Sequence, residues 1–338
     1  MTSGDYDNEK NGIYKADKHN PCIIFDDFTT SFHWVDYDFK AKSSAMKMLR
    51  PKTGVNFRYV YYAMKCIKFV PRSHQRHWIS KYSHFSIPIP SPSEQQRIVE
   101  TLDTFANSIE NLKQQIAERK KQYNLYLDKA YYFDKKELLN AADKGEIAVK
   151  SFNEIGSFTR GRRFVRTDIV EEGVPCVHYG DMYTYYGVWA DKTPTHLTEE
   201  KASKLRFAKK GDVIIVGAGE NDIDIGVGLA WLGEEDVVVH DACFIFKHNI
   251  NSKYLSYFMQ SMNYHMQIKT GVVDGKICSI SADELGKTLI GLPTLTEQQR
   301  IVENLDTLVA SIKNLEQQLE LRQKEYEYYR NKLLTFDK

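Results

Sequence analysis

The chain has 338 residues, of which 42% are hydrophobic and 27% charged, and this composition is typical of a folded protein with two or three domains. No apolar run is long enough to cross a bilayer and no signal peptide opens the chain, so we expect a cytoplasmic protein with no membrane partner. The five cysteines stand apart without a CxxC pair, which argues against a disulfide framework and a metal site. The net charge of +1 excludes binding of a polyanion by bulk charge and leaves only local basic patches for it.

Residues 1–92 carry 14 Lys and Arg against 8 Asp and Glu, and we expect a short globular domain here. Cys22–Phe25 is a candidate strand, Arg58–Met64 resembles the later segment Lys253–Met259, and Ile87–Pro90 matches Ile290–Pro293. The stretch therefore reads as a truncated copy of the domain at residues 143–293, without most of the front half of that domain.

Residues 93–142 are expected to form the first long helix, and they open with a segment that recurs later in the chain. SEQQRIVETLDTF begins at Ser93, and TEQQRIVENLDTL begins 203 residues later, with similarity that continues for about 40 residues. Before each copy, Ser91 or Thr294 can accept a hydrogen bond from a free helix amide, and the glutamate three residues on can reach back to the amide of the cap. We interpret the repeat as two matched helix starts, rather than as chemistry of the Glu-Gln-Gln-Arg side chains.

The apolar residues of both copies follow alternating steps of four and three, the 3.5-residue period of a coiled coil. We expect two helices of about 40 residues, each roughly 60 Å long at 1.5 Å per residue, that pair antiparallel. The predicted interface consists of Ile98, Leu102, Phe105, Ile109, Leu112, Ile116, Ile301, Leu305, Leu308, Ile312, Leu315 and Leu319.

Residues 143–293 are predicted to form a second mixed α/β domain, and residues 294–338 form the second long helix. The candidate strands are Pro175–Tyr179, Val213–Val216, Val237–Phe246 and Leu289–Pro293. Asn251 and Ser252 are expected to cap a helix that runs to about Lys269, with Met262 and Met266 facing inward. The fold class is thus α+β, with two mixed α/β domains that are each followed by a long helix.

Two copies of P-x-x-E-Q-Q-R-I-V, each after a globular domain, resemble the specificity (S) subunit of type I restriction–modification systems. The resemblance covers essentially the whole chain, and Gly211-Asp212-Val213-Ile214-Ile215 and Gly275-Lys276-Ile277 also look like features of its target-recognition domains. A full-length member of the family has a further stretch before the position of Met1. This departure suggests a truncated product, a silent recombination partner, or an unusual functional form.

The resemblance implies that each globular domain reads one half of a split sequence in double-stranded DNA. It further implies that the long helices set the spacing of the half-sites and bind the methyltransferase (M) subunits, through which the motor–nuclease restriction (R) subunit joins. No cofactor is then expected on this chain, because S-adenosylmethionine, ATP and Mg act in the partner subunits. The chain itself is expected to have no catalytic activity.

The motif search agrees with a protein that is not an enzyme. The chain has no GxxxxGK[ST] phosphate loop, no dinucleotide-binding glycine pattern and no D/N/S-P-P-Y/F segment of an adenine methyltransferase. Glu118-Arg119-Lys120 has the E-x-K spacing of some nucleases, but it lies within the coiled-coil stretch. His74 and His77 lack a nearby thiol or carboxylate that would complete a metal site.

The candidate DNA contacts are local clusters of basic and aromatic residues. Arginine suits guanine edges and phosphates, and the segment from Thr159 to Arg166 holds four arginines around a glycine. The candidates in the second domain are Arg160, Arg162, Arg163, Arg166, Tyr183, Tyr185, Lys269 and Lys276. Those in the first domain are Arg72, Arg76, His77 and Lys81.

Three other functions stay open at this point. The chain could be a coiled-coil scaffold that binds proteins, with its arginines merely solvated, or a non-functional fragment of a specificity gene. A standalone nuclease or methyltransferase is the third, and the missing motifs argue against it. Salt-dependent DNA binding separates the first of these from the DNA-recognition function.

Overall fold

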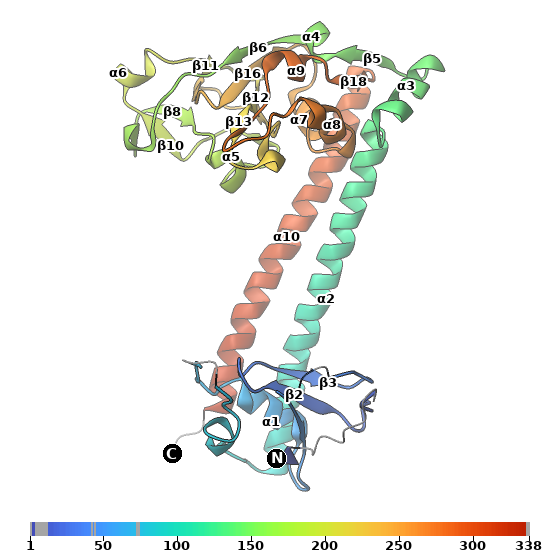
Figure 1. The fold of residues 1–338 in the computed structure, drawn as a ribbon, viewed down its shortest axis with the longest axis vertical. Coiled ribbons are helices and arrows are strands. Elements are labelled where there is room, and N and C mark those ends of the chain that lie inside the picture. Colours follow the sequence, from blue (N-terminus) through green and yellow to red (C-terminus); the bar gives the residue numbers. More distant parts are fainter. Residues whose placement is uncertain (1, 4–12, 42, 44, 72–74, 336–338) are drawn as a thin grey trace. The chain divides into compact units, whose positions relative to one another are not determined.

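The computed structural model describes residues 2–3, 13–41, 43, 45–71 and 75–335 (Figure 1). The chain forms two compact units, one of residues 1–116 with 314–338 and one of residues 117–313. We describe each unit by itself. Within the described residues, no helix combines the length and the apolar character that a membrane crossing requires.

The first unit contains a four-stranded antiparallel sheet in the order β1-β4-β2-β3. Ile23 and Phe25 of β2 are fully buried, because they pack against α1 and the aromatic side chains of Trp78 and Tyr82. The elements that lie wholly in this unit are β1 Thr2–Ser3, β2 Cys22–Asp26, β3 Phe32–Val35, β4 Met46–Arg50, α1 Phe57–Met64 and the 3₁₀ turn η1 Tyr82–His84. The predicted strand at Cys22–Phe25 is confirmed, whereas residues 87–90 are not in a strand.

The second unit is built on two five-stranded mixed sheets, in the orders β6-β16-β12-β14-β9 and β11-β15-β8-β10-β7. Two strand pairs, β13–β17 and β18–β5, complete it. The strands are β5 Ala148–Ser151, β6 Gly156–Arg160, β7 Ile169–Val170, β8 Val174–Val177, β9 Trp189–Ala190, β10 Thr195–Leu197, β11 Phe207–Ala208, β12 Val213–Val216, β13 Ala218–Gly219, β14 Gly228–Trp231, β15 Val237–Val239, β16 Cys243–His248, β17 Cys278–Ser279 and β18 Leu289–Leu292.

Helices of the second unit are mostly short. They are α3 Lys135–Asp143, α4 Phe152–Ile155, α5 Asp181–Thr184, α6 Glu199–Ala202, α7 Ser252–Phe258, α8 Met262–Ile268 and α9 Ala282–Gly286, with 3₁₀ turns η2 Arg166–Asp168, η3 Asp222–Asp224 and η4 Lys269–Gly271. The central strand β12 reads Val-Ile-Ile-Val and is buried at every residue, because β14 and β16 flank it and α7 packs against it. This all-apolar run is what a strand covered on both faces requires.

Two sequence predictions in this unit are corrected. The predicted strand Val237–Phe246 is two strands, since the backbone turns at His240, where the amide of Cys243 donates to its carbonyl at 3.0 Å. The predicted helix to Lys269 is also two helices, α7 and α8. Ser261 begins the second helix by accepting from the amide of Tyr264 at 3.3 Å. This restart turns Tyr264 inward and leaves Met262 and Met266 each 48% exposed.

The two long helices, α2 Pro92–Tyr131 and α10 Leu295–Leu334, have 40 residues each, as the repeat predicts. In the first unit, the ring of Phe105 on α2 stacks on Tyr329 of α10 with centroids 5.2 Å apart. In the second unit, Asn304 of α10 donates to the hydroxyl of Tyr126 on α2 at 2.7 Å. Both pairs bring the first half of one helix to the second half of the other, so the helices pair antiparallel in each unit.

The predicted interface residues differ in what covers them. Ile98 and Leu102 pack on Tyr59 and Tyr62 of α1 as well as on Leu334, and Ile301 and Leu305 belong to the core of the second unit. Leu112 and Ile116 are 9% and 8% exposed. The remaining predicted residues, Phe105, Ile109, Leu308, Ile312, Leu315 and Leu319, are half-buried. The stripe is therefore a helix–helix seam whose ends also pack on the globular parts.

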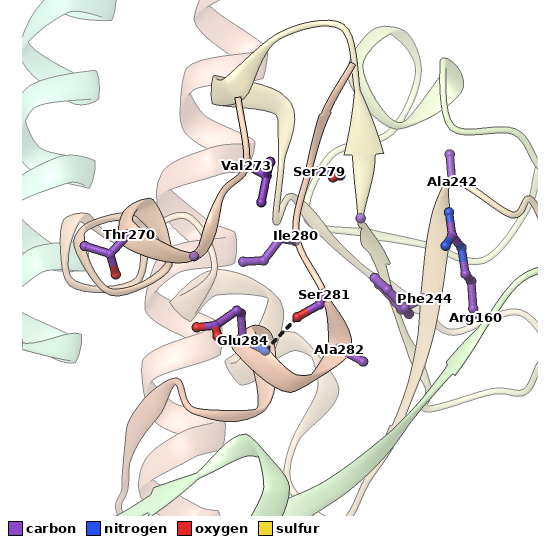
Figure 2. A pocket seen from close by; sticks show the side chains of 12 residues that line it. Arg160, Ala242, Phe244, Thr270, Val273, Ser279, Ile280, Ser281, Ala282 and Glu284 are labelled. Atoms are coloured by element: carbon purple, nitrogen blue, oxygen red, sulfur yellow. Dashed lines mark hydrogen bonds between the residues drawn. The ribbon is translucent and has the colours of Figure 1, made fainter. Parts of the chain in front are cut away.

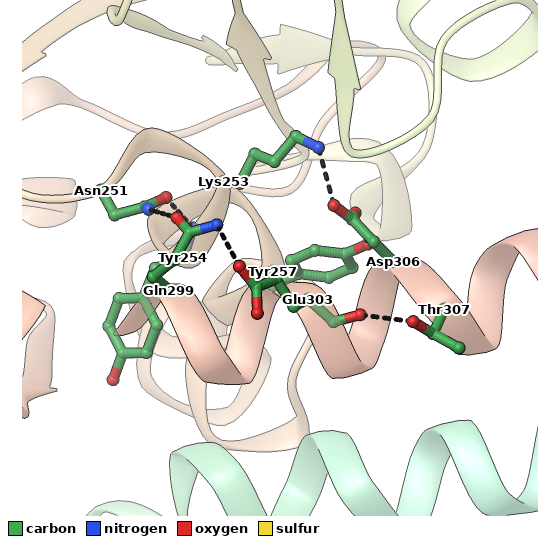
Figure 3. A network of polar contacts seen from close by, with 8 residues as sticks. All are labelled: Asn251, Lys253, Tyr254, Tyr257, Gln299, Glu303, Asp306 and Thr307. Carbon is green, nitrogen blue, oxygen red and sulfur yellow. Dashed lines mark hydrogen bonds and ion pairs between the residues drawn. The ribbon is translucent and has the colours of Figure 1, made fainter. Parts of the chain in front are cut away.

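Matched polar contacts fasten each long helix to a domain helix. In the second unit, Gln298 accepts from the amide of Asn251 at 3.1 Å, and Gln299 accepts from the side chain of Asn251 at 3.0 Å. Asp306 pairs with Lys253 at 2.7 Å and accepts from the hydroxyl of Tyr257 at 2.7 Å (Figure 3). We call these six residues the second clasp.

The first clasp repeats these contacts in the other unit. Its residues are Asn56, Arg58, Tyr62, Gln95, Gln96 and Asp103. Arg58 lies 2.7 Å from Asp103, and burial together with the hydrogen bond to Asp103 raises the pKa of Tyr62. The clasps confirm the predicted likeness of Arg58–Met64 to Lys253–Met259, since α1 and α7 make the same contacts.

The clasps also correct our interpretation of the repeated segment. Its glutamines do explain the repeat, because Gln95 and Gln298 are 2% and 3% exposed and carry the contacts between helices. Ser91 and Thr294 each accept from the amide three residues on at 3.3 Å, as expected for helix caps. The glutamates that follow do not reach back to the cap, because each pairs with the arginine three residues later, at 2.6 Å.

Candidate nucleic-acid interface

A cleft of about 760 Å³ in the second unit brings four of the predicted basic residues together. It lies where the ends of β6, β8 and β13 meet the turn between β15 and β16. Its basic lining residues are Arg160, Arg163, Arg166 and Lys276, and its acidic ones are Glu220 and Asp241. Phe164, Val165, His178, Tyr179, Ala218, Gly219, His240, Ala242 and Ile277 complete the wall.

The arginine loop after β6 is held in place by Gly161 and Phe164. A Cβ atom at Gly161 would lie 2.1 Å from the carbonyl oxygen of His240 and 2.4 Å from that of Val239, so only glycine fits this close approach. Phe164 is 1% exposed and packs edge-on against His178 and His240. With its ring fixed in the interior, the neighbouring arginine side chains stay at the surface.

The exposed cations of this cleft are not neutralised by the protein. The side chains of Arg163, Arg166 and Lys276 make no hydrogen bond or ion pair to any residue that the structure describes, and all three residues are exposed. The carboxylate of Asp168, close in sequence, is taken by Lys201 at 2.8 Å and by the amide of Val165. Cations without a protein partner are available for an anion, and phosphate and guanine edges suit them.

Two imidazoles form the floor of the cleft. The rings of His178 and His240 lie 4.6 Å apart, and Tyr179 lies 5.2 Å from His240. Burial lowers the pKa of both histidines. Repulsion from His240 lowers the pKa of His178 further, and repulsion from Arg163 lowers the pKa of His240 further. Each Nδ1 accepts from a backbone amide two residues on, from Gly180 and Ala242. Sequence reasoning missed these aromatic residues, since the parallel pairing of β8 with β15 brings them together.

A second cavity of about 730 Å³ adjoins the cleft, because Arg160 and Ala242 line both (Figure 2). Phe244, Val273 and Ile280 give it apolar walls, and Glu284 gives it a carboxylate. Ser281 caps α9 by accepting from the amide of Glu284 at 3.1 Å. Arg160 donates through Nε to the carbonyl of Asp241 at 2.8 Å, which holds its guanidinium at the boundary of the two cavities.

Four other candidates of this unit lie outside the cleft. Arg162 donates to the carbonyl of Lys204 at 2.8 Å, which turns it away from Arg163. The hydroxyl of Tyr183 is buried without a hydrogen-bond partner among the described residues, and burial raises the pKa of this tyrosine. Tyr185 is 59% exposed, and Lys269 is exposed at the end of α8.

The candidates of the first unit form no comparable cleft in the part that the structure describes. Arg72, together with His74, lies outside the described residues. Arg76 and Lys81 are exposed, and the ammonium of Lys81 lies 5.9 Å from the ring of Phe69. His77 is 2% exposed and packs edge-on against Phe69. It is therefore part of the core, and its prediction as a surface residue that contacts DNA is corrected.

No group of three or more potential metal ligands occurs among the described residues. The five cysteines are unpaired, and four of them are buried. Burial raises the pKa of Cys243 to about 12, so this thiol stays protonated. The charged groups that line the two adjoining cavities are therefore side chains of arginine, lysine, aspartate and glutamate.

The fold and the lining of the cleft are those of a protein with a basic surface cleft, and comparison with known proteins identifies its family. The family model described as "Type I restriction modification DNA specificity domain" matches residues 4–120 and 144–322 of this chain. The chain belongs to this family, whose members are the DNA-recognition subunits of type I restriction–modification complexes.

Individual relatives agree with this assignment. The chain is 36% identical to the specificity subunit of the type I restriction enzyme EcoR124I/EcoR124II of Escherichia coli, over 98% of this chain and 84% of that protein. It is 26% identical to a putative type I specificity subunit of Haemophilus influenzae, over 90% of this chain and 79% of that protein.

Two solved structures share the fold. The S subunit of a type I system from M. genitalium superposes with a TM-score of 0.57 at 17% identity, over 96% of this chain and 85% of that chain. A structure that describes complex assembly and conformational transition of the type I restriction–modification system gives 0.54 at 15% identity, over 94% and 82%.

Proposed function

We propose that the second unit reads one half of a split target in double-stranded DNA through the cleft between β6, β8 and the turn after β15. The observation that carries this proposal is the set of three exposed cations, Arg163, Arg166 and Lys276, without a partner among the described residues. A cleft with unpaired cations at its rim attracts phosphates, and release of their counterions makes such binding weaken steeply with salt.

In this proposal the long helices bind the methyltransferase subunits, and the motor–nuclease subunit joins through them. The exposed faces of α2 and α10 are rich in Glu, Gln and Lys, which suits a polar contact with a partner. We propose that catalysis, and with it S-adenosylmethionine, ATP and Mg, belongs to the partner subunits. Methylation or cleavage of DNA by the isolated chain would contradict this part of the proposal.

The first unit is proposed to contact the other half of the target through its exposed basic residues. Arg76 and Lys81 are the described candidates for that contact. Mapping of methylated adenines after co-expression with the cognate methyltransferase subunit tests both units. A split motif supports two reading domains, a motif with one defined half supports the second unit alone, and the absence of methylation contradicts the proposal.

Single arginine substitutions test the cleft directly. In the complex with methyltransferase subunits, we expect Arg163→Ala to weaken DNA binding and to reduce the slope of log K against log salt by about 1. Arg162→Ala is the matched control, because Arg162 has the same charge in the same loop but donates to Lys204. Equal effects of the two substitutions would contradict the cleft, and binding without salt dependence would favour a protein-binding scaffold.

A further inference from the structure

The segment that carries Lys276 is a short hairpin whose residues line both cavities. The amide of Val273 donates to the carbonyl of Ser279 at 2.8 Å, and the amide of Ser279 donates back at 3.1 Å. β17 then pairs with β13, which fixes the base of the hairpin on the unit. We call residues Val273–Ser279 the reading loop.

The reading loop exposes apolar side chains at its two sides. Val273 is 66% exposed and lines the smaller cavity (Figure 2). Ile277 is 63% exposed and lines the larger cleft. Lys276, beside Ile277, also lines the cleft. Val273 and Ile277 are exposed β-branched residues on a fixed hairpin that lines both cavities, so they are available for contact with a ligand bound there.

The surrounding charge identifies the kind of ligand. Arg160, Arg163 and Arg166 line the same cleft as Ile277 and Lys276. The carboxylate of Asp274, also in the loop, lies 4.0 Å from the sulfur of Cys278 and does not line the cleft. A partner that complements exposed cations around an apolar tip is a polyanion with apolar groups between its charges. The major groove of DNA has this character, because thymine methyl groups and base edges lie between two rows of phosphates.

We propose that the reading loop enters the major groove, that Ile277 contacts a thymine methyl group and Lys276 a guanine edge, and that Arg163 and Arg166 hold the flanking phosphates. The inference rests on the proposed function and adds to it a division of labour. Phosphate contacts fix register without sequence information, and base contacts specify sequence. The two groups of residues therefore have different mutant phenotypes.

Methylation mapping of variants in the complex with methyltransferase subunits tests the division. We expect Ile277→Ala to lower the preference for one A·T pair of the target by about 5-fold or more, and Lys276→Ala to do the same at a G·C pair. Arg166→Ala is expected to reduce methylation of all sites equally. Ile223→Ala is the matched control, because Ile223 is 76% exposed in the same unit but lines neither cavity.

A substituted oligonucleotide isolates the methyl contact. In the wild-type complex, replacement of the contacted thymine by uracil removes the methyl group and is expected to weaken binding, whereas the Ile277→Ala complex loses nothing further. An unchanged motif for both loop variants, or equal uracil effects in wild type and variant, overturns the division of labour. If the wild-type complex itself reads no motif and binds DNA without salt dependence, the proposed function fails and the inference fails with it.

Discussion

Removal of the Asp306 carboxylate tests how firmly the second clasp holds α7 on α10. Asp306→Ala leaves the hydroxyl of Tyr257, a residue that is 1% exposed, without its acceptor, and this costs about 1–3 kcal/mol. The ion pair with Lys253 has side chains 20% and 32% exposed and contributes about 0.5 kcal/mol, since solvent screens it and the ring of Trp189 still lies 4.0 Å from the ammonium. We expect a total loss of about 1.5–3.5 kcal/mol.

A loss of this size lowers Tm by roughly 3–14 °C for a unit of this length. Thermal and urea denaturation, followed by circular dichroism and tryptophan fluorescence, measures it. Glu303→Ala is the matched control, because Glu303 lies on the same helix but is exposed and bonds only Gln299 and its own turn, and we expect a change within about 0.5 kcal/mol. If the Asp306→Ala variant has the same Tm and urea midpoint as the Glu303→Ala variant, the clasp does not stabilise the unit.

Three further predictions concern the pH response, the arginine loop and the helix seam. Burial lowers the pKa of His248 to about 4, so the unfolded chain binds a proton at this residue before the folded chain does. The free energy of unfolding therefore falls as pH drops from about 6.5 to about 4. We expect His248→Gln to reduce this fall, measured as the urea midpoint at each pH, and the exposed control His84→Gln to leave it unchanged. Gly161→Ala should disrupt the cleft and lower stability by about 2 kcal/mol or more in the same assay, because its Cβ meets backbone oxygen. Leu112→Asp with Leu315→Asp should reduce helicity and binding to methyltransferase subunits, since Leu112 is 9% exposed. Unchanged helicity and binding would contradict the seam.

The parts of the fold that depend on residues close together in the sequence were predictable from the sequence. The caps at Ser91 and Thr294 and the heptad stripe are local patterns, and the two long helices follow from them. The end of the first long helix was predicted wrongly, because residues 93–142 are not one helix: α2 ends at Tyr131 and α3 begins at Lys135. Tyr132 takes a left-handed backbone with φ of 62°, and Asp134 then caps α3 by accepting from the amide of Glu137.

The contacts between distant segments were not predictable. Gln95 and Asn56 are 39 residues apart, and no local sequence pattern in either segment indicates that the two residues form a hydrogen bond. For the same reason, the floor of the cleft was missed, because His178 and His240 meet only through the pairing of β8 with β15. The dense run of arginines was visible, but the different directions of Arg162 and Arg163 depend on the carbonyl of Lys204.

The clasps have a consequence for the evolution of the reading surface. In each clasp, three residues at one short helix of the domain contact the long helix, and Arg58 in one clasp is replaced by Lys253 in the other with the same aspartate contact. The attachment is therefore separate from the residues of the cleft and tolerates a change of cation. A recombination event that exchanges the stretch between the two repeated segments preserves the attachment when the incoming stretch keeps the asparagine, cation and tyrosine of the clasp, so the proposed reading surface can change without redesign of the helices.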